Sequence, residues 1–150
     1  MVLVIGIGNT LRRDDGAGWL FAQALADELR SAGVEVDLLL QHQLTPELAE
    51  LAAERAPQML VFVDASTAVD DVTLTPLEAD RVAAPVSHHL SPAAILAIAQ
   101  RLYGMNGRGR LVQIAARDLG HGEGLSATAA RGLASAPTIA AGILADLGAA

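Results

Sequence analysis

The chain has 150 residues, of which 52% are hydrophobic, and it contains no cysteine. Its ten basic residues, all arginine, are outnumbered by 17 acidic ones, which gives a net charge of −7 at pH 7. This balance argues against a nucleic-acid partner, and the lack of cysteine excludes disulfides and thiolate metal ligands. No apolar run approaches the roughly 20 residues that span a bilayer. We therefore expect one domain, residues 1–150, in a cytoplasmic protein without a membrane partner.

Apolar patterning predicts strands that alternate with helices. In chain order we expect strand 2–7, helix 15–32, strand 34–40, a helix from Thr45-Pro46, strands 59–63 and 71–76, a helix from Ser91-Pro92, strand 111–115 and a helix through 139–147. Four of these strands are continuously apolar, which is typical of parallel strands covered on both faces. The run 71–76 alternates and ends in proline, which indicates an edge strand. The order predicts a three-layer α/β/α domain with a mostly parallel, twisted sheet of about five strands.

Two helix starts are marked by a hydroxyl residue that is followed by proline. Thr45 precedes Pro46, and Ser91 precedes Pro92. A hydroxyl can accept the free N–H groups of a first helical turn, and proline suits the first helical position. We therefore expect Thr45 and Ser91 to cap their helices.

Acidic residues follow two of the predicted strands. Asp14 and Asp15 lie where the first strand leads into the first helix, and Asp64 closes the strand at 59–63. Helix capping would account for Asp14 or Asp15 alone, and an Asx turn would account for Asp64. However, the carboxyl ends of parallel strands share one edge of a sheet, which is where sites form in open α/β sheets. We therefore expect a carboxylate site at this edge.

Two adjacent histidines, His88 and His89, precede the helix at Ser91-Pro92. Adjacent side chains on an extended chain point in opposite directions, so one of them is expected to face the site. Together with Asp15 and Asp64, one histidine completes a ligand set of two oxygens and one nitrogen. Such a set suits a divalent transition-metal ion and leaves coordination positions open for a substrate.

Further polar residues are placed to contact a substrate. Asn9 follows a glycine turn, from which it could orient Asp15, and His42 follows the second strand at the same sheet edge. We expect Asn9, Asp14, His42 and His88 to line the substrate site.

Nucleotide binding is disfavoured. The glycine pair Gly6 and Gly8 follows the first strand, but Leu11 stands where a dinucleotide motif has its third glycine. Two carboxylates near the helix start would also repel phosphates, and the chain has no lysine for a Walker motif.

Four segments carry a pattern that is known from one protein family: Gly6–Gly18, Leu60–Ala65, Ser87–Pro92 and Gly122–Ser126. They resemble the hydrogenase maturation proteases, the endopeptidases that trim the C-terminus of the [NiFe]-hydrogenase large subunit. The resemblance covers essentially the whole chain. It implies an endopeptidase whose partner is the large-subunit precursor.

The resemblance also implies roles for single residues. Asp15 and Asp64 match the carboxylate ligands, and His89, rather than His88, matches the histidine ligand. These three are implied to engage nickel that the precursor already holds, and to carry catalysis by either a metal-assisted or an aspartic-type mechanism. We expect a monomer that needs no nucleotide. A nickel-binding chaperone for the same precursor would share these ligands and stays open as the alternative.

One segment departs from the family pattern. Some members carry an Asp-Gly-Gly-Thr-like segment after the second strand, where this chain has Gln41–Leu48. We interpret this as a subgroup difference in the groove that reads the substrate.

Overall fold

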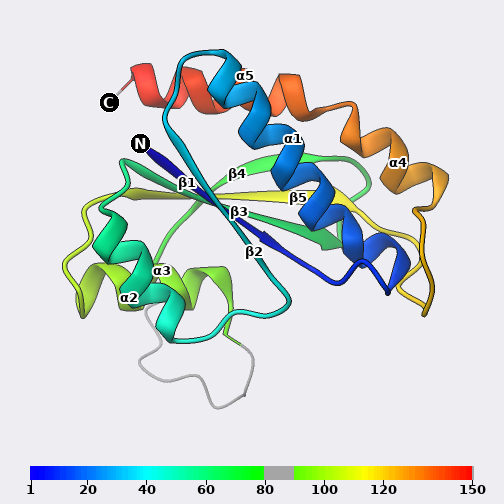
Figure 1. The fold of residues 1–150 in the computed structure, drawn as a ribbon, viewed down its shortest axis with the longest axis horizontal. Helices are drawn as coiled ribbons and strands as arrows, with labels where there is room; N and C mark the ends of the chain where they lie inside the picture. Colours follow the sequence, from blue (N-terminus) through cyan, green and yellow to red (C-terminus); the bar gives the residue numbers. More distant parts are fainter. Residues whose placement is uncertain (80–89, 150) are drawn as a thin grey trace.

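A five-stranded sheet forms the centre of the protein in a computed structural model that describes residues 1–79 and 90–149 (Figure 1). Its strands are β1 (Val2–Ile7), β2 (Val36–Gln41), β3 (Met59–Ser66), β4 (Thr73–Leu77) and β5 (Arg108–Ala115). The strand order is β2-β1-β3-β5-β4. All neighbours are parallel except β4, which pairs with β5 in the antiparallel direction at one edge. The mostly parallel sheet and the edge strand were both predicted from the sequence and are confirmed.

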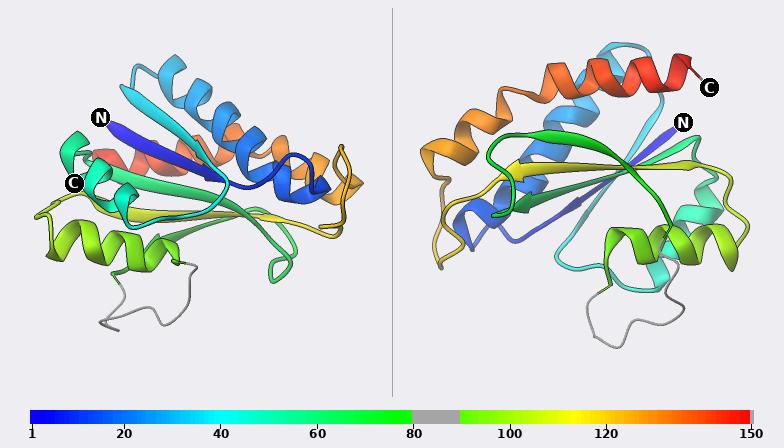
Figure 2. Two further views of the ribbon diagram at one scale, coloured as in Figure 1. Left: turned by 60° about the horizontal axis from the view of Figure 1, so that its bottom comes forward. Right: turned by 180° about the vertical axis from the view of Figure 1, so that it is seen from behind.

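Helices cover both faces of the sheet. They are η1 (Arg13–Gly16, a short 3-10 helix), α1 (Ala17–Ser31), α2 (Glu47–Arg55), α3 (Pro92–Arg101), α4 (Ala127–Leu133) and α5 (Ala136–Gly148). Figure 1 and the two views in Figure 2 show α1, α4 and α5 on one face, with α2 and α3 on the other. This arrangement confirms the predicted three-layer α/β/α architecture. No helix within the described ranges is long and apolar enough to cross a membrane.

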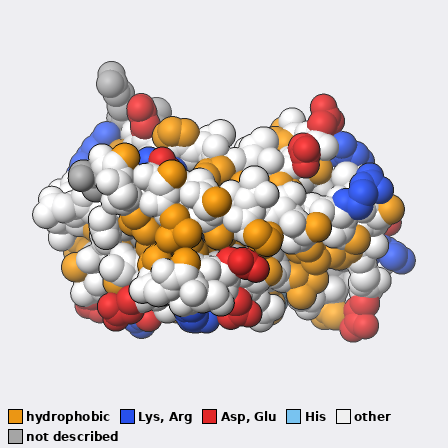
Figure 3. Space-filling view, turned by 90° about the horizontal axis from the view of Figure 1, so that it is seen from above, with side chains coloured by type: hydrophobic (Ala, Val, Ile, Leu, Met, Phe, Trp, Pro, Cys, Tyr) orange, Lys and Arg blue, Asp and Glu red, His pale blue; other side chains and the backbone are white. Residues whose placement is uncertain are grey.

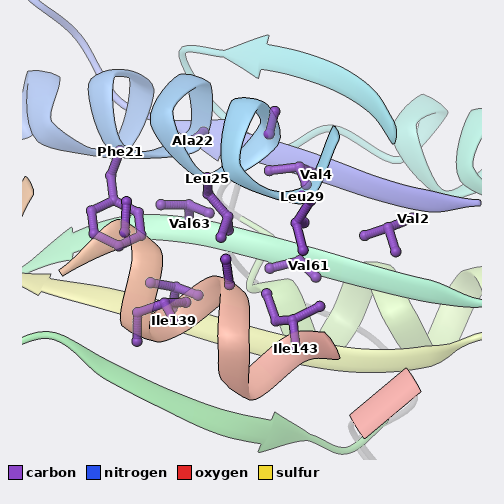
Figure 4. Packing of buried hydrophobic residues seen from close by; sticks show 14 of the residues in the cluster. Val2, Val4, Phe21, Ala22, Leu25, Leu29, Val61, Val63, Ile139 and Ile143 are labelled. Atoms are coloured by element: carbon purple, nitrogen blue, oxygen red, sulfur yellow. The ribbon is translucent and has the colours of Figure 1, made fainter. Parts of the chain in front are cut away.

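Each face of the sheet has its own apolar core. In β1, Val2 and Val4 belong to the cluster beneath α1 and α5, whereas Leu3 and Ile5 belong to the cluster beneath α2 and α3. This division explains why the strand is apolar at every position. Figure 4 shows the first cluster, where α1 and α5 meet β3 through the side chains of Phe21, Leu25, Leu29, Val61, Val63, Ile139 and Ile143. The outer surface of this helical layer mixes charged side chains of both signs with hydrophobic ones (Figure 3).

Two predicted helix starts had different outcomes. The hydroxyl of Ser91 accepts a hydrogen bond from the backbone N–H of Ala94 at 3.1 Å, which confirms this cap. The cap predicted at Thr45 was wrong, because α2 begins without a side-chain cap. The Thr45 hydroxyl instead donates a hydrogen bond to the carboxylate of Glu47.

The sequence analysis missed α4 and the full length of β3. The seven residues of α4 include three alanines and one glycine, so they show no apolar stripe of helical spacing. The strand β3 extends to Ser66 and therefore includes Asp64, which was expected at its end. The helix predicted to begin near residue 15 begins as the 3-10 turn η1, and its α-helical part starts at Ala17.

The first turn of α1 lies directly against the ends of β1 and β3. A Cβ atom at Gly18 would lie 2.0 Å from the carbonyl oxygen of Ile7 and 3.2 Å from that of Val63. Only glycine leaves room for this approach, because both neighbouring atoms belong to the backbone. The beginning of α1 is thereby fixed at the carboxyl edge of the sheet.

We predict that Gly18→Ala destabilises the protein by about 1–3 kcal/mol or more, because the added methyl group meets a backbone that is held in the sheet. The free energy of unfolding in urea measures this effect. The matched control is Gly148→Ala at the end of α5, where an added Cβ meets no atom within 4 Å. That variant is expected to lose no stability. Equal stability of Gly18→Ala and the wild type would contradict the proposed contact.

Candidate active site

The candidate site lies at the carboxyl ends of the two central strands. In the register between β1 and β3, Gly6 is paired with Val63, so Ile7 and Asp64 follow side by side. Asp64 is half-buried there. Its position at this sheet edge agrees with the sequence prediction.

Asp15 is brought to the same edge by a second close approach of the backbone. It belongs to η1, which follows the loop after β1. A Cβ atom at Gly8 would lie 2.0 Å from the carbonyl oxygen of Asp15 and 3.9 Å from its carboxyl carbon. The glycine at position 8 therefore lets η1 fold back over the end of β1.

Asp15 is close enough to Asp64 to influence the charge of the Asp64 carboxyl group. Burial raises the pKa of Asp64, and the negative charge of Asp15 raises it further. A hydrogen bond with the backbone of Ala65 opposes these effects only in part, and the resulting pKa is about 6. The structure thus brings together the two carboxylates that the sequence placed at one edge.

The neighbouring carboxylate, Asp14, has a structural role. It is 0% exposed. Its oxygens accept hydrogen bonds from the backbone N–H groups of Arg117 (2.7 Å), Asp118 (3.0 Å) and Ser126 (2.7 Å), and from the Ser126 hydroxyl (2.7 Å). Burial acts to raise the pKa of Asp14, but these hydrogen bonds outweigh it and lower the pKa. The side chain is enclosed and its acceptors are occupied, which does not support the predicted contact of Asp14 with the substrate.

Ser126 is a residue of this region that the sequence analysis did not assign. Its hydroxyl donates to Asp14 and also accepts the backbone N–H of Ala129 at 3.2 Å, so it caps α4. Asp14 and Ser126 are 112 positions apart. No local pattern joins residues at that separation, and the one available signal was that Ser126 ends the segment Gly122–Ser126.

A pocket of about 240 Å³ opens beside Asp64. The residues that line it are Ile7, His42, Gln43, Leu44, Asp64, Leu90 and Pro92. These residues come from β1, from the loop after β2, from β3 and from the start of α3. Most of the lining is apolar, and Asp64 is its acidic group.

Two of the predicted substrate contacts lie at this edge. His42 is exposed and lines the pocket. Asn9 uses its side-chain carbonyl in an Asx turn, where it accepts the backbone N–H of Leu11 at 2.9 Å. A contact of either residue with substrate stays a prediction.

His88 and His89 lie outside the described residues. Within the described ranges, no group of three or more histidine, cysteine or acidic side chains could hold a metal ion. A metal ion at Asp15 and Asp64 would need its further ligands from outside these ranges or from a bound partner.

The fold is shared with solved structures of known proteins. No protein-family model and no curated protein match the sequence. Among solved structures, the [NiFe]-hydrogenase maturation protease HycI from Thermococcus kodakarensis is 24% identical over 95% of this chain and 88% of its own, with a TM-score of 0.59. The hydrogenase maturating endopeptidase HybD from E. coli is 19% identical over 98% of this chain and 93% of its own, with a TM-score of 0.65. The chain therefore has the fold of the hydrogenase maturation proteases.

Proposed function

We propose that this chain is an endopeptidase that removes the C-terminal peptide of a [NiFe]-hydrogenase large-subunit precursor once the precursor holds nickel. The observation that carries the proposal is the pair Asp15 and Asp64, where burial and a like charge raise the pKa of Asp64 to about 6. Perturbed carboxylates in a pocket are typical of catalytic sites. The proteins that share the fold and are named as maturation proteases support the same reading. We expect the enzyme to act as a monomer in the cytoplasm.

The nickel is part of the substrate in this proposal. Asp15, Asp64 and His89 would bind the ion that the precursor presents, and an immature precursor without nickel would lack the feature that they recognise. Two carboxylates and an imidazole are suitable ligands for a divalent transition-metal ion. The chain offers no thiolate, so we expect nickel to bind weakly to the free protein.

Asp64 is suited to act as a general base. A carboxylate with a pKa of about 6 is ionised at neutral pH and is more basic than an ordinary aspartate. In the aspartic-type mechanism, with no ion on its carboxylate, it would take a proton from the water that attacks the scissile carbonyl, and its burial together with the charge of Asp15 keeps its proton affinity high. A nickel ion bound in the precursor would supply Lewis-acid polarisation when it is present. Both the aspartic-type and the metal-assisted mechanism place Asp64 at the reacting atoms.

One prediction of the proposed function concerns cutting of the precursor. Incubation with this protein is expected to shorten a nickel-loaded large-subunit precursor and to leave a nickel-free precursor intact, as measured by intact mass. Asp64→Asn is expected to abolish the cut, because the amide is not a base. His89→Ala is expected to abolish it as well, whereas His88→Ala has a smaller effect.

Each other outcome of this assay has a defined meaning. Cutting of both precursors would support the endopeptidase activity and would contradict the nickel requirement. A stable complex with no loss of mass, found with several precursors, would replace the protease with the chaperone alternative. Full processing by Asp64→Asn would remove Asp64 from the mechanism, and the reverse order of the two histidine variants would exchange their roles.

A further prediction concerns the stability of the free protein. The pKa of Asp64 is higher in the folded state, about 6, than its ordinary value of 3.8, so its favourable contribution exists at low pH and is lost as pH rises through 6. At pH 8 the ionised side chain opposes folding. Asp64→Asn is therefore expected to raise the free energy of unfolding at pH 8 by roughly 1–3 kcal/mol, with a smaller gain at pH 4.

Urea unfolding at the two pH values measures this difference. The control is Asp27→Asn on the exposed surface of α1, which is expected to change stability by less than about 0.5 kcal/mol at either pH. A loss of stability in Asp64→Asn at pH 8 would show that the carboxylate is a favourable structural element and not a strained one.

A further inference from the structure

Trp19 lies at the point where α1 meets the ends of β1 and β2. Its indole N–H donates a hydrogen bond to the carbonyl oxygen of Gln41 at 3.0 Å. The same oxygen accepts the backbone N–H of Gly8 at 3.0 Å. Three elements are thereby joined at one acceptor, and the orientation of the indole ring is fixed by the helix on one side and the sheet on the other.

His42 follows Gln41 in the chain, and its imidazole ring contacts the indole ring of Trp19. The ring centroids of Trp19 and His42 are 4.9 Å apart, and the ring planes are inclined by 42°. Trp19 thus contacts both the backbone just before His42 and the imidazole itself. His42 is exposed and lies in the loop that follows β2, so this contact limits where its side chain can turn.

His42 lines the pocket beside Asp64. Among the described residues that line it, those other than Asp64, His42 and Gln43 are apolar. Its apolar members are Ile7, Leu44, Leu90 and Pro92. An acidic side chain would lose water on entering such a space and would meet the like charge of Asp64, whereas an apolar side chain would gain contact area.

We propose that Trp19 is a positioning residue, which holds His42 in the wall of this pocket so that the pocket takes an apolar side chain of the substrate next to the bond that is cut. The proposal rests on the proposed endopeptidase function. Trp19 itself acts through His42, and the pair determines which side chain is accepted beside Asp64.

The free protein provides the first test, because Trp19 is its one tryptophan. Quenching of tryptophan fluorescence by acrylamide reports how far the indole is covered. His42→Ala is expected to raise the quenching constant by about twofold, since one side of the indole loses its aromatic neighbour. The matched control, His121→Ala, removes another exposed histidine in the loop before α4 and is expected to change nothing. Equal quenching in the wild type and His42→Ala would overturn the proposal.

Kinetics with the nickel-loaded precursor provide the second test. Trp19→Phe keeps an aromatic ring but removes the indole N–H, and it is expected to raise KM by about fivefold, the effect of one hydrogen bond, with kcat unchanged. His42→Ala is expected to raise KM at least as much. The double variant is expected to match His42→Ala alone, because Trp19 has no further route to the substrate. Additive effects, or a fall in kcat alone, would overturn the proposal.

Side-chain preference is tested in the same assay after the cut bond has been located by mass. Replacing the apolar residue next to this bond with aspartate is expected to raise KM for the wild type, and Trp19→Phe is expected to reduce this discrimination. Equal use of both precursors by the wild type would overturn the apolar preference. If no precursor is cut at all, the proposed function fails, and the quenching comparison still decides whether His42 is held against Trp19.

Discussion

The contact between the first turn of α1 and the carboxyl ends of β1 and β3 determines the geometry of the candidate site. It depends on Gly8 and Gly18, where any larger residue would place a Cβ atom 2.0 Å from a backbone oxygen. With these glycines present, η1 folds back over β1, and Asp15 comes within electrostatic reach of Asp64. Gly8 and Asp15 are close to one another in sequence. Asp64 is distant from both in sequence, and it lies on β3 in the centre of the sheet. Without this approach of the backbone, the carboxylates of Asp15 and Asp64 would not lie near one another.

Adjacent residues in η1 have opposite tasks. Asp14 is fully buried and accepts four hydrogen bonds, which keep its charge and fasten η1 to the loop before α4. Asp15 stays partly accessible beside Asp64. The pKa values of Asp14 and Asp64 move in opposite directions, because burial and then the like charge of Asp15 raise the pKa of Asp64, whereas hydrogen bonds outweigh burial at Asp14 and lower its pKa. The different environments of Asp14 and Asp64 thus separate a structural carboxylate from a candidate catalytic one.

Sequence patterns predicted the parts of this structure that depend on local composition. The continuous apolar runs gave the parallel strands, and the shared edge of parallel strands was enough to place Asp15 and Asp64 together. The sequence could not separate the roles of Asp14 and Asp15, because the groups that enclose Asp14 come from Arg117–Ser126, more than 100 positions away. The helix α4 was not predicted because its alanine-rich sequence shows little helical pattern. Its start is stabilised by Ser126, whose hydroxyl also donates a hydrogen bond to Asp14.

The segment Gln41–Leu48 shows how a departure from a family pattern acquires a physical meaning. Where some hydrogenase maturation proteases carry an Asp-Gly-Gly-Thr-like segment, this chain carries Gln41–Leu48, which includes His42. An imidazole in an exposed loop needs a neighbour to fix its rotamer. Trp19 supplies that neighbour from α1, and its indole N–H is satisfied by the carbonyl oxygen of Gln41 at the end of β2. His42 in the loop and Trp19 in the helix are therefore in contact, and the end of β2 lies against both of them. A glycine at position 42 would leave the pocket beside Asp64 wider and would remove the imidazole from its wall. Because Trp19 of α1 contacts this imidazole, the shape of the pocket depends on α1 as well as on the loop.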